Sequence, residues 1–120
     1  MFNEPALNTF DPAVAGDRDG AKEYRIIGEK LVEVKRLGDI LHSFENLPAI
    51  DILSVDVEGL DLQVLKSNDW DRFRPRIIIA ECLSMAMEDI SSDSVYRYLM
   101  DLDYSVYAKT GHSVIFVSKR

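Results

Sequence analysis

The sequence predicts an α/β domain whose parallel strands are followed by an antiparallel β-hairpin. Two short, almost continuous apolar runs, 50–55 and 76–80, are rich in β-branched residues, which is typical of parallel strands covered on both faces. Between them, residues 60–66 have the spacing of an amphipathic helix, with Asp61 among the residues that can face water. Strand, helix and strand together have the length of a right-handed crossover unit.

Upstream of this unit the chain has three segments with different sequence patterns. Residues 1–23 are punctuated by Asn, Pro, Asp and Gly, so we expect a loop or leader there, with a short helix inside it as the alternative. Residues 24–36 have β character and predict either a hairpin or one bent strand. Residues 37–44 have helical spacing. The predicted division is therefore a leader at 1–23 and a folded domain at 24–120.

Downstream of the second strand, the pattern predicts a helix and then a hairpin. Apolar residues at i, i+3, i+4 and i+7 predict the helix at 95–102, with Ser92 or Asp93 as its cap. Two strands follow, at 104–108 and 113–119, and the connection between them contains a glycine. A parallel sheet that finishes in an antiparallel hairpin is the natural assembly of these elements.

Composition and charge narrow the classes of partner. A chain of 120 residues that is 47% hydrophobic is long enough for one domain with a core. Its net charge of −7 argues against a nucleic-acid backbone or an anionic membrane. The sequence contains neither a membrane-spanning apolar run nor the features of a signal peptide. The single cysteine, Cys82, excludes an intramolecular disulfide and a multi-cysteine metal site. We therefore expect a cytoplasmic protein without nucleic-acid or membrane partners.

The candidate functional residues lie where the predicted strands end. Asp56, Glu58 and Gly59 follow the first strand, and Glu81 ends the second. Ligands of open α/β sheets bind outside the carboxyl ends of the strands. Because neighbouring strands are about 4.8 Å apart, we expect Asp56 and Glu81 on one rim, close enough to influence each other's protonation. Gly59 allows a tight turn or the close approach of a ligand. Alternatively, Asp56 caps the following helix and Glu58 stabilises its first turn.

Four other residues with reactive or aromatic side chains have structural interpretations. We expect His42 on the surface of its helix and His112 in the hairpin turn. Cys82 is interpreted as a small buried apolar residue. Trp70 is expected to pack the end of the central helix onto the sheet.

Three segments carry a resemblance to a known family. They are IDILSVDVEGLDLQVLKSNDW at 50–70, RPRIIIAE at 74–81 and DYSVYAKTGHSVIFV at 103–117. Together they resemble the C-terminal half of the FkbM-type methyltransferase family. VEVKRLGDIL and ALNTFDPAVA are similar to the stretches that precede it, so the resemblance covers nearly the whole chain. Its most specific part is DVEG together with the strand that carries Glu81.

The resemblance implies an S-adenosylmethionine-dependent enzyme with a Rossmann-like, doubly wound sheet. Many members methylate a hydroxyl of a sugar or natural product, which implies a small-molecule or glycan acceptor. Asp56 resembles the acidic residue beside the reacting methyl group, where it could orient the acceptor hydroxyl or take its proton. Glu58 and Glu81 are the further catalytic candidates.

The resemblance also implies that the first half of the family's domain is missing. The six glycines are scattered and none forms the family's glycine-rich donor loop after a buried strand. The expected sheet is the second half only: the fourth and fifth strands and the reversed final pair. Donor-binding residues are therefore not assigned, with Asp56 and Gly59 as the nearest candidates, and we expect weak or no catalysis by this chain alone.

Two other functions remain as alternatives. The chain could be a non-catalytic half-domain that acts as an interaction module or self-associates through the sheet edge that the missing strand would pair with. It could also be a magnesium-dependent phosphodiesterase, because Asp51, Asp56, Glu58 and Glu81 carry hard oxygen ligands. Some nucleases have a lysine two positions after the glutamate, where this chain has leucine. We therefore predict no metal site.

Overall fold

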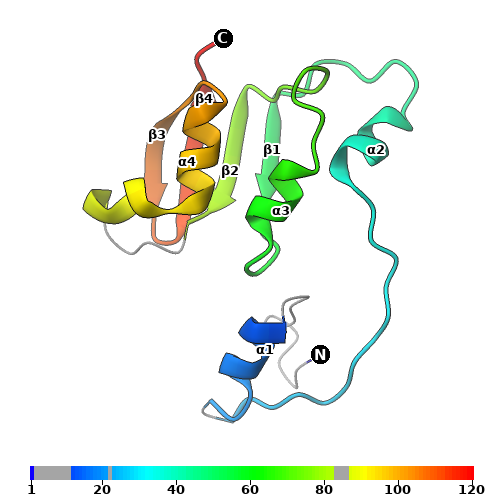
Figure 1. Ribbon diagram of the computed structural model, residues 1–120, viewed down its shortest axis with the longest axis vertical. Coiled ribbons are helices and arrows are strands. Elements are labelled where there is room, and N and C mark those ends of the chain that lie inside the picture. Colours follow the sequence, from blue (N-terminus) through cyan, green and yellow to red (C-terminus); the bar gives the residue numbers. More distant parts are fainter. Residues whose placement is uncertain (2–11, 22, 83–86) are drawn as a thin grey trace. The chain divides into compact units, whose positions relative to one another are not determined.

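The computed structural model describes residues 1, 12–21, 23–82 and 87–120, and it divides into two compact units (Figure 1). Unit 1 comprises Met1–Val34 and Val57–Leu60, and unit 2 comprises Lys35–Asp56 and Asp61–Arg120. The whole described sheet belongs to unit 2. In the part of the chain that the structure describes, no helix has the length and apolar character needed to cross a membrane.

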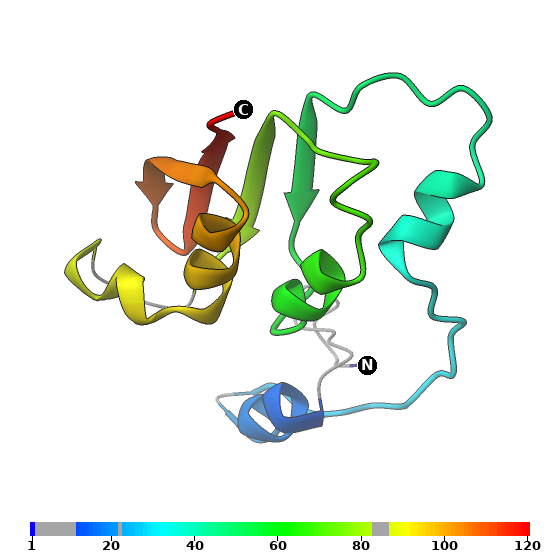
Figure 2. The same cartoon turned by 45° about the horizontal axis from the view of Figure 1, so that its top comes forward.

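The sheet of unit 2 has four strands in the order β1-β2-β4-β3 (Figure 2). β1 and β2 are parallel, as predicted, with Val55 beside Ala80. β4 lies between β2 and β3 and is antiparallel to both, so the predicted hairpin is confirmed. The strands are β1 (Ile52–Val55), β2 (Ile77–Glu81), β3 (Tyr104–Thr110) and β4 (Ser113–Ser118).

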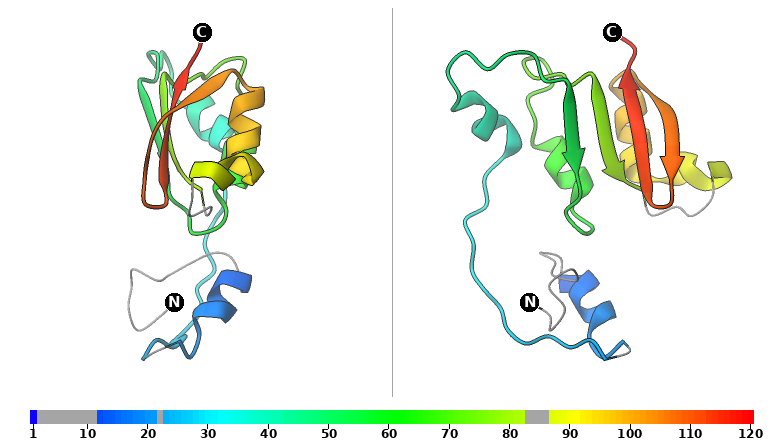
Figure 3. Two further views of the ribbon diagram at one scale, coloured as in Figure 1. Left: turned by 90° about the vertical axis from the view of Figure 1, so that its left-hand side faces the viewer. Right: turned by 180° about the vertical axis from the view of Figure 1, so that it is seen from behind.

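Two helices, α3 (Asp61–Lys66) and α4 (Ser94–Asp101), lie on the same face of this sheet, as Figure 3 shows in its side view. Each presents a leucine that is completely buried, Leu65 from α3 and Leu99 from α4. Alternate strand residues face these helices, because successive side chains of a strand point to opposite faces, and most of these residues are buried. The strand residues of this core are Val55, Ile78, Ala80, Tyr104, Val114 and Phe116.

The opposite face of the sheet has no helix over it in the described part of unit 2. Ile52 is 57% exposed there, and the other aliphatic side chains of this face are only half-buried. We call this surface the open face; its aliphatic members are Ile52, Ile77, Ile79, Ile115 and Val117. Within the described part of unit 2, helices cover one face of the sheet, and the prediction that both faces are covered stays a prediction. The apolar runs at 50–55 and 76–80 make both faces apolar, but both sheet-packed helices lie on one side.

The caps and contacts of the helices explain where they begin and end. The Asp93 carboxylate accepts hydrogen bonds from the backbone N–H groups of Val95 (2.8 Å) and Tyr96 (3.2 Å), so the predicted Asp93 cap of α4 is confirmed. A 3-10 helix, η2 (Met87–Ser92), precedes it. The indole of Trp70 donates to the carbonyl of Leu65 at 3.0 Å. Its ring also meets those of Tyr98 and Tyr104 edge-on, which confirms that Trp70 packs the end of α3.

Helix α2 (Leu37–His42) ends two residues before the predicted boundary and is anchored to the loop after α3. The Ser67 hydroxyl accepts from the N–H of Leu37 at 2.9 Å, and the Ser67 carbonyl accepts from that of Gly38 at 3.0 Å. A Cβ on Gly38 would lie only 3.1 Å from the backbone of Ser67 and Asp69. Such a contact is tighter than most Cβ contacts, so the close approach favours a glycine at this position.

Unit 1 contains helix α1 (Pro12–Arg18), the alternative expected within residues 1–23. The proposed boundary between residues 23 and 24 stays a prediction. Residues 24–36 form neither a hairpin nor a bent strand, because the described backbone there shows only an isolated bridge at Ile26. Leu31 is fully exposed and Val34 is 82% exposed. In the described structure these residues, which favour strands, do not pair with another strand.

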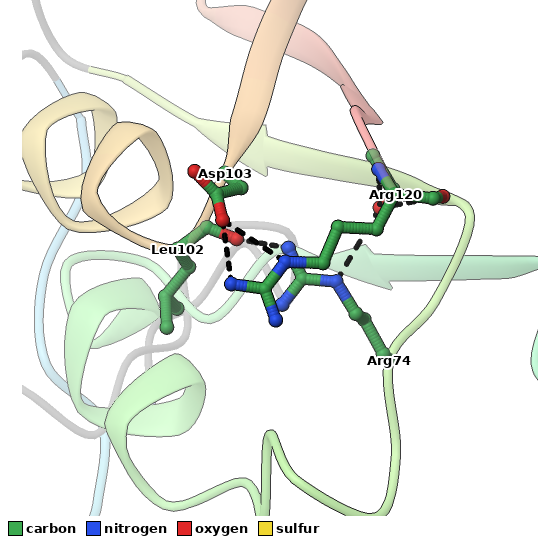
Figure 4. A network of polar contacts seen from close by, with 5 residues as sticks. Arg74, Leu102, Asp103 and Arg120 are labelled. Carbon is green, nitrogen blue, oxygen red and sulfur yellow. Dashed lines mark hydrogen bonds and ion pairs between the residues drawn. The ribbon is translucent and has the colours of Figure 1, made fainter.

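At the end of the chain, a polar network ties β4 to the turn after α4 (Figure 4). The Arg120 guanidinium donates to the Asp103 carboxylate at 2.9 and 2.5 Å. This hydrogen bond and the charge of Arg120 hold the pKa of Asp103 below its usual value. The Arg74 guanidinium donates to the carbonyl of Leu102 and lies 4.8 Å from the centre of the Tyr104 ring. Burial raises the pKa of that tyrosine.

Candidate functional site

The candidate site lies at the carboxyl ends of the parallel strands in unit 2. Asp56 directly follows β1, and Glu81 is the last residue of β2. Since Val55 pairs with Ala80, these two carboxylates occupy equivalent positions on strands about 4.8 Å apart. Asp56 is exposed and Glu81 is half-buried. We call this pair the carboxylate rim; the structure places both residues as expected, and their mutual influence and catalytic roles stay predictions.

A buried carboxylate supports the rim from the side of α3. The side chain of Asp61 accepts a hydrogen bond from the backbone N–H of Glu81 at 3.2 Å. Asp61 is only 4% exposed, so the prediction that it faces water is wrong. The helical pattern places Asp61 at the start of α3, and only the pairing of β1 with β2 brings Glu81 within its reach. This bond satisfies a buried polar group and joins α3 to the end of β2.

The turn between β1 and α3, residues 57–60, belongs to unit 1. Gly59 has φ +101°, a conformation that side chains rarely adopt, so the expected tight turn is confirmed. Glu58 has φ +52° and precedes the helix, which begins at Asp61. The interpretation that Glu58 stabilises the first helical turn is therefore wrong. Its carboxylate forms an ion pair with the guanidinium of Arg18, and its catalytic role stays a prediction.

Cys82 follows the rim and is completely buried, as predicted. Burial, followed by the nearby Asp93 carboxylate, raises the pKa of its thiol from 9.0 to about 12. Because the thiolate is the nucleophilic form, this environment makes Cys82 inert at neutral pH. Its backbone N–H donates to the carbonyl of His112 at 2.8 Å. His112 itself is exposed in the hairpin turn, as expected.

A concave region lies at the other end of α3 from the carboxylate rim, between α2 and the loop that follows α3. It is a hollow of about 490 Å³ whose lining includes Arg36, Asp39, His42 and Asp69. His42 is on the surface, as predicted, and its Nε2 lies 2.8 Å from the Asp69 carboxylate. This hydrogen bond lowers the pKa of Asp69. The hollow is separate from the carboxylate rim, which lies at the start of α3.

The carboxylates of the phosphodiesterase hypothesis do not share one site. Asp51 precedes β1 and Asp56 follows it, so they lie at opposite ends of the strand. The Asp51 carboxylate is instead 3.3 Å from the guanidinium of Arg76. Within residues 1, 12–21, 23–82 and 87–120, no three His, Cys, Asp or Glu residues gather in a way that could hold a metal ion.

A mixed α/β sheet with carboxylates at the ends of its parallel strands is typical of domains that bind ligands at that edge. The chain belongs to the methyltransferase FkbM domain family, whose model matches residues 4–106. The predicted family is therefore confirmed.

Two named methyltransferases are similar to short parts of the chain. Methyltransferase 1 of Beauveria bassiana (strain ARSEF 2860) is 46% identical over 46 residues, which are 36% of this chain and 18% of that protein. Methyltransferase sdnD of Sordaria araneosa is 40% identical over 57 residues, which are 39% of this chain and 22% of that protein. The matched part is thus a small share of each relative's length. No solved structure matches the chain.

Proposed function

We propose that the chain is part of an S-adenosylmethionine-dependent methyltransferase that methylates a hydroxyl of a sugar or small natural product. Its membership of the FkbM family supports methyl transfer. The observation that carries the proposal is the carboxylate rim, since Asp56 and Glu81 end neighbouring parallel strands, where such sheets bind ligands. The acceptor is proposed to be a small molecule or glycan in the cytoplasm; the net charge of −7 and the single cysteine support this choice.

Asp56 is proposed as the residue that contacts the acceptor. Transfer of a methyl group to a hydroxyl requires that the oxygen be positioned and its proton removed. Asp56 is exposed at the rim, so a bound hydroxyl can reach its carboxylate, which would accept the proton as a general base. Glu81, whose backbone is held by Asp61, and Glu58 are proposed to assist it.

The described residues do not fit the methyl donor. The turn after β1 contains one glycine, Gly59, and the chain's other glycines are scattered rather than joined in a loop that opens onto a helix. We therefore assign donor binding to elements other than the described ones. In this proposal β1 and β2 correspond to the fourth and fifth strands of a Rossmann-like sheet, and the β3–β4 hairpin is its reversed final pair.

Isothermal titration of the purified chain with S-adenosylhomocysteine tests this assignment. We expect a dissociation constant weaker than about 100 µM, because the donor cradle is absent from the described residues. Micromolar binding that Asp56→Ala abolishes would contradict it and would mean that this chain builds its own donor pocket. Asp51→Ala is the matched control, since Asp51 is an exposed aspartate at the opposite end of β1.

A chimera tests the role of Asp56 in catalysis. In a complete enzyme of the FkbM family, the residues that correspond to 50–81 of this chain, which lie within the family match at 4–106, are replaced by the residues found here. Release of S-adenosylhomocysteine is then measured with that enzyme's own acceptor. We expect Asp56→Asn in the chimera to lower kcat about 10²- to 10³-fold, the usual contribution of a general base. The chimera with Asp51→Asn should keep its rate. Equal rates for the two variants would remove Asp56 from the mechanism.

A second candidate function is that of a non-catalytic interaction module. The specific observation in its favour is the open face, an apolar surface over which the described part of unit 2 places no helix. Monomeric proteins rarely leave such a surface exposed. The face is compatible with either function, since an enzyme also has to cover it.

A further inference from the structure

We propose that the turn of the β3–β4 hairpin completes the acceptor site and that the acceptor is a polyhydroxylated ring, such as a sugar. Thr110 and Ser113 are assigned as the residues that determine this specificity. The assignment rests on the proposed function, because it names the substrate class of the same site. It narrows the acceptors to molecules with several hydroxyls on one ring.

The hairpin turn lies at the same edge of the sheet as the carboxylate rim. Ser113, the first residue of β4, pairs with Glu81, the last residue of β2. Thr110, the last residue of β3, pairs in turn with Ser113. The backbone N–H of Cys82 donates to the carbonyl of His112 at 2.8 Å, which fixes the turn to the end of β2. Figure 3 shows the arrowheads of β1 and β2 at the same end of the sheet as this turn.

Four polar side chains at this edge lie on the same side of the sheet, because paired residues of neighbouring strands point to the same face. The pairing places Ser113 between Glu81 and Thr110. The register of β1 with β2 places Asp56 level with Glu81. The adjacent residues of these strands point the other way and are buried: Val55, Ala80 and Val114. We call the four residues Asp56, Glu81, Ser113 and Thr110 the polar row.

A ligand can reach the polar row from the end of the strands. Three of its members are exposed, and Glu81 is half-buried. Because the row is at the edge of the sheet, a ligand approaches it outside the carboxyl ends of β1 and β2, as ligands of open α/β sheets do. Such an approach is possible whether or not other elements cover the rest of that face.

The chemistry of the polar row favours a ligand with several hydroxyls. Carboxylates accept hydrogen bonds, and the hydroxyls of Ser113 and Thr110 both donate and accept. Adjacent members of the row are about 4.8 Å apart, so a ring with hydroxyls on successive carbons can contact several of them at once. A ligand with a single hydroxyl leaves most of the row unpaired, and a site built to bind hydroxyls rejects such a ligand for that reason. The row therefore selects a sugar over an apolar natural product.

Titration of the isotope-labelled chain with myo-inositol, followed by NMR, tests the proposal. This probe has a hydroxyl on every carbon of its ring, and cyclohexanol, with one hydroxyl on the same ring, is the matched control. For myo-inositol we expect a dissociation constant of about 1–10 mM, given its size, and shifts of the amide signals of the polar row. Cyclohexanol should bind at least about tenfold more weakly. The titration needs no methyl donor, so binding at the row together with failure of the catalytic tests of Asp56 would mean a sugar site without the proposed methyl transfer.

Variants of the turn separate ligand binding from hairpin stability, to which a Thr–Ser pair across two strands also contributes. Ser113→Ala and Thr110→Val should each raise the dissociation constant for myo-inositol about 3- to 10-fold, the usual effect of one hydrogen bond. Ser113→Thr keeps a hydroxyl and should bind as the unchanged chain does. Ser105→Ala, on the same side of the sheet near the other end of β3, is the control, and urea unfolding verifies that each variant is folded.

Loss of affinity in Ser113→Ala that Ser113→Thr avoids supports the polar row as the sugar site. Unshifted amide signals in the row at 100 mM myo-inositol, about tenfold above the weakest expected dissociation constant, overturn the proposal. Equal affinity for cyclohexanol also overturns it. So does an equal dissociation constant in Ser113→Ala and Ser113→Thr, because the hydroxyl would then not contact the ligand.

Discussion

The two faces of the sheet in unit 2 are built from the same kinds of residue but differ in what covers them. On the helix side, Ile78 and Phe116 are completely buried under α3 and α4. On the open face, Ile79 and Ile115, their neighbours along the same strands, remain half-buried. The comparison teaches that apolar character in a strand shows which residues seek burial. It does not show whether the same chain provides the covering surface.

The largest expected difference between the two faces is in how much a mutation on each face lowers the stability of the chain. Phe116→Ala should lower the free energy of unfolding by about 3–5 kcal/mol, because it leaves a cavity in a closed core. Ile115→Ala, its neighbour on the open face, should cost only about 1 kcal/mol, since that side chain is already partly hydrated. Urea unfolding of the two variants measures the difference. Equal losses would mean that the open face is covered as tightly as the helix side.

The second-largest expected effect is a difference in the rate at which a thiol on each face reacts. Cys82 is buried and its pKa is about 12, so it should react with a thiol reagent at pH 8 only when the structure opens. A cysteine on the open face, Ile52→Cys in a Cys82→Ala background, should react at least about 100-fold faster. Stopped-flow labelling of the unchanged chain and of the Ile52→Cys, Cys82→Ala variant gives both rates. Similar rates would contradict the burial of Cys82.

The smallest expected effect concerns the end of the sheet, where Arg120 holds Asp103. The pKa of Asp103 is lowered in the folded chain, so its contribution to stability is present above the unfolded value of 3.8 and is lost as the pH falls through the folded value. Asp103→Asn should therefore flatten the acid loss of stability below about pH 4. Urea unfolding at a series of pH values, with Asp101→Asn as control, measures this change. An unaltered acid slope would show that the ion pair does not contribute.

Local sequence patterns were sufficient for the elements with strong internal signals. The apolar runs at 50–55 and 76–80 predicted two parallel strands. The residue type at position 93 predicted the helix cap, and two strand patterns separated by a glycine-containing turn predicted the hairpin. These features depend on residues close together in the chain, such as Asp93 and the N–H groups two and three positions later. The same patterns failed at 24–36, because β character does not provide a partner strand.

The candidate site was only partly predictable for a related reason. Asp56 and Glu81 could be placed at strand ends from the sequence, because the order of strand, helix and strand implies a shared edge. Asp61 was missed, since its partner is the backbone of Glu81, 20 positions later. Helical periodicity assigns a side chain to a face of its helix but not to the strand end that the helix meets.

The sequence by itself determined the family, the order of the four strands and of the helices α2, α3 and α4, and the position of acidic residues at strand ends. Only the tertiary structure decided that β4 inserts between β2 and β3, that Asp61 is buried, and that α3 and α4 share one face of the sheet. The physical reason is the range of the interactions. Turns, caps and periodicity act over a few residues, whereas strand order and burial depend on contacts between segments far apart in the chain.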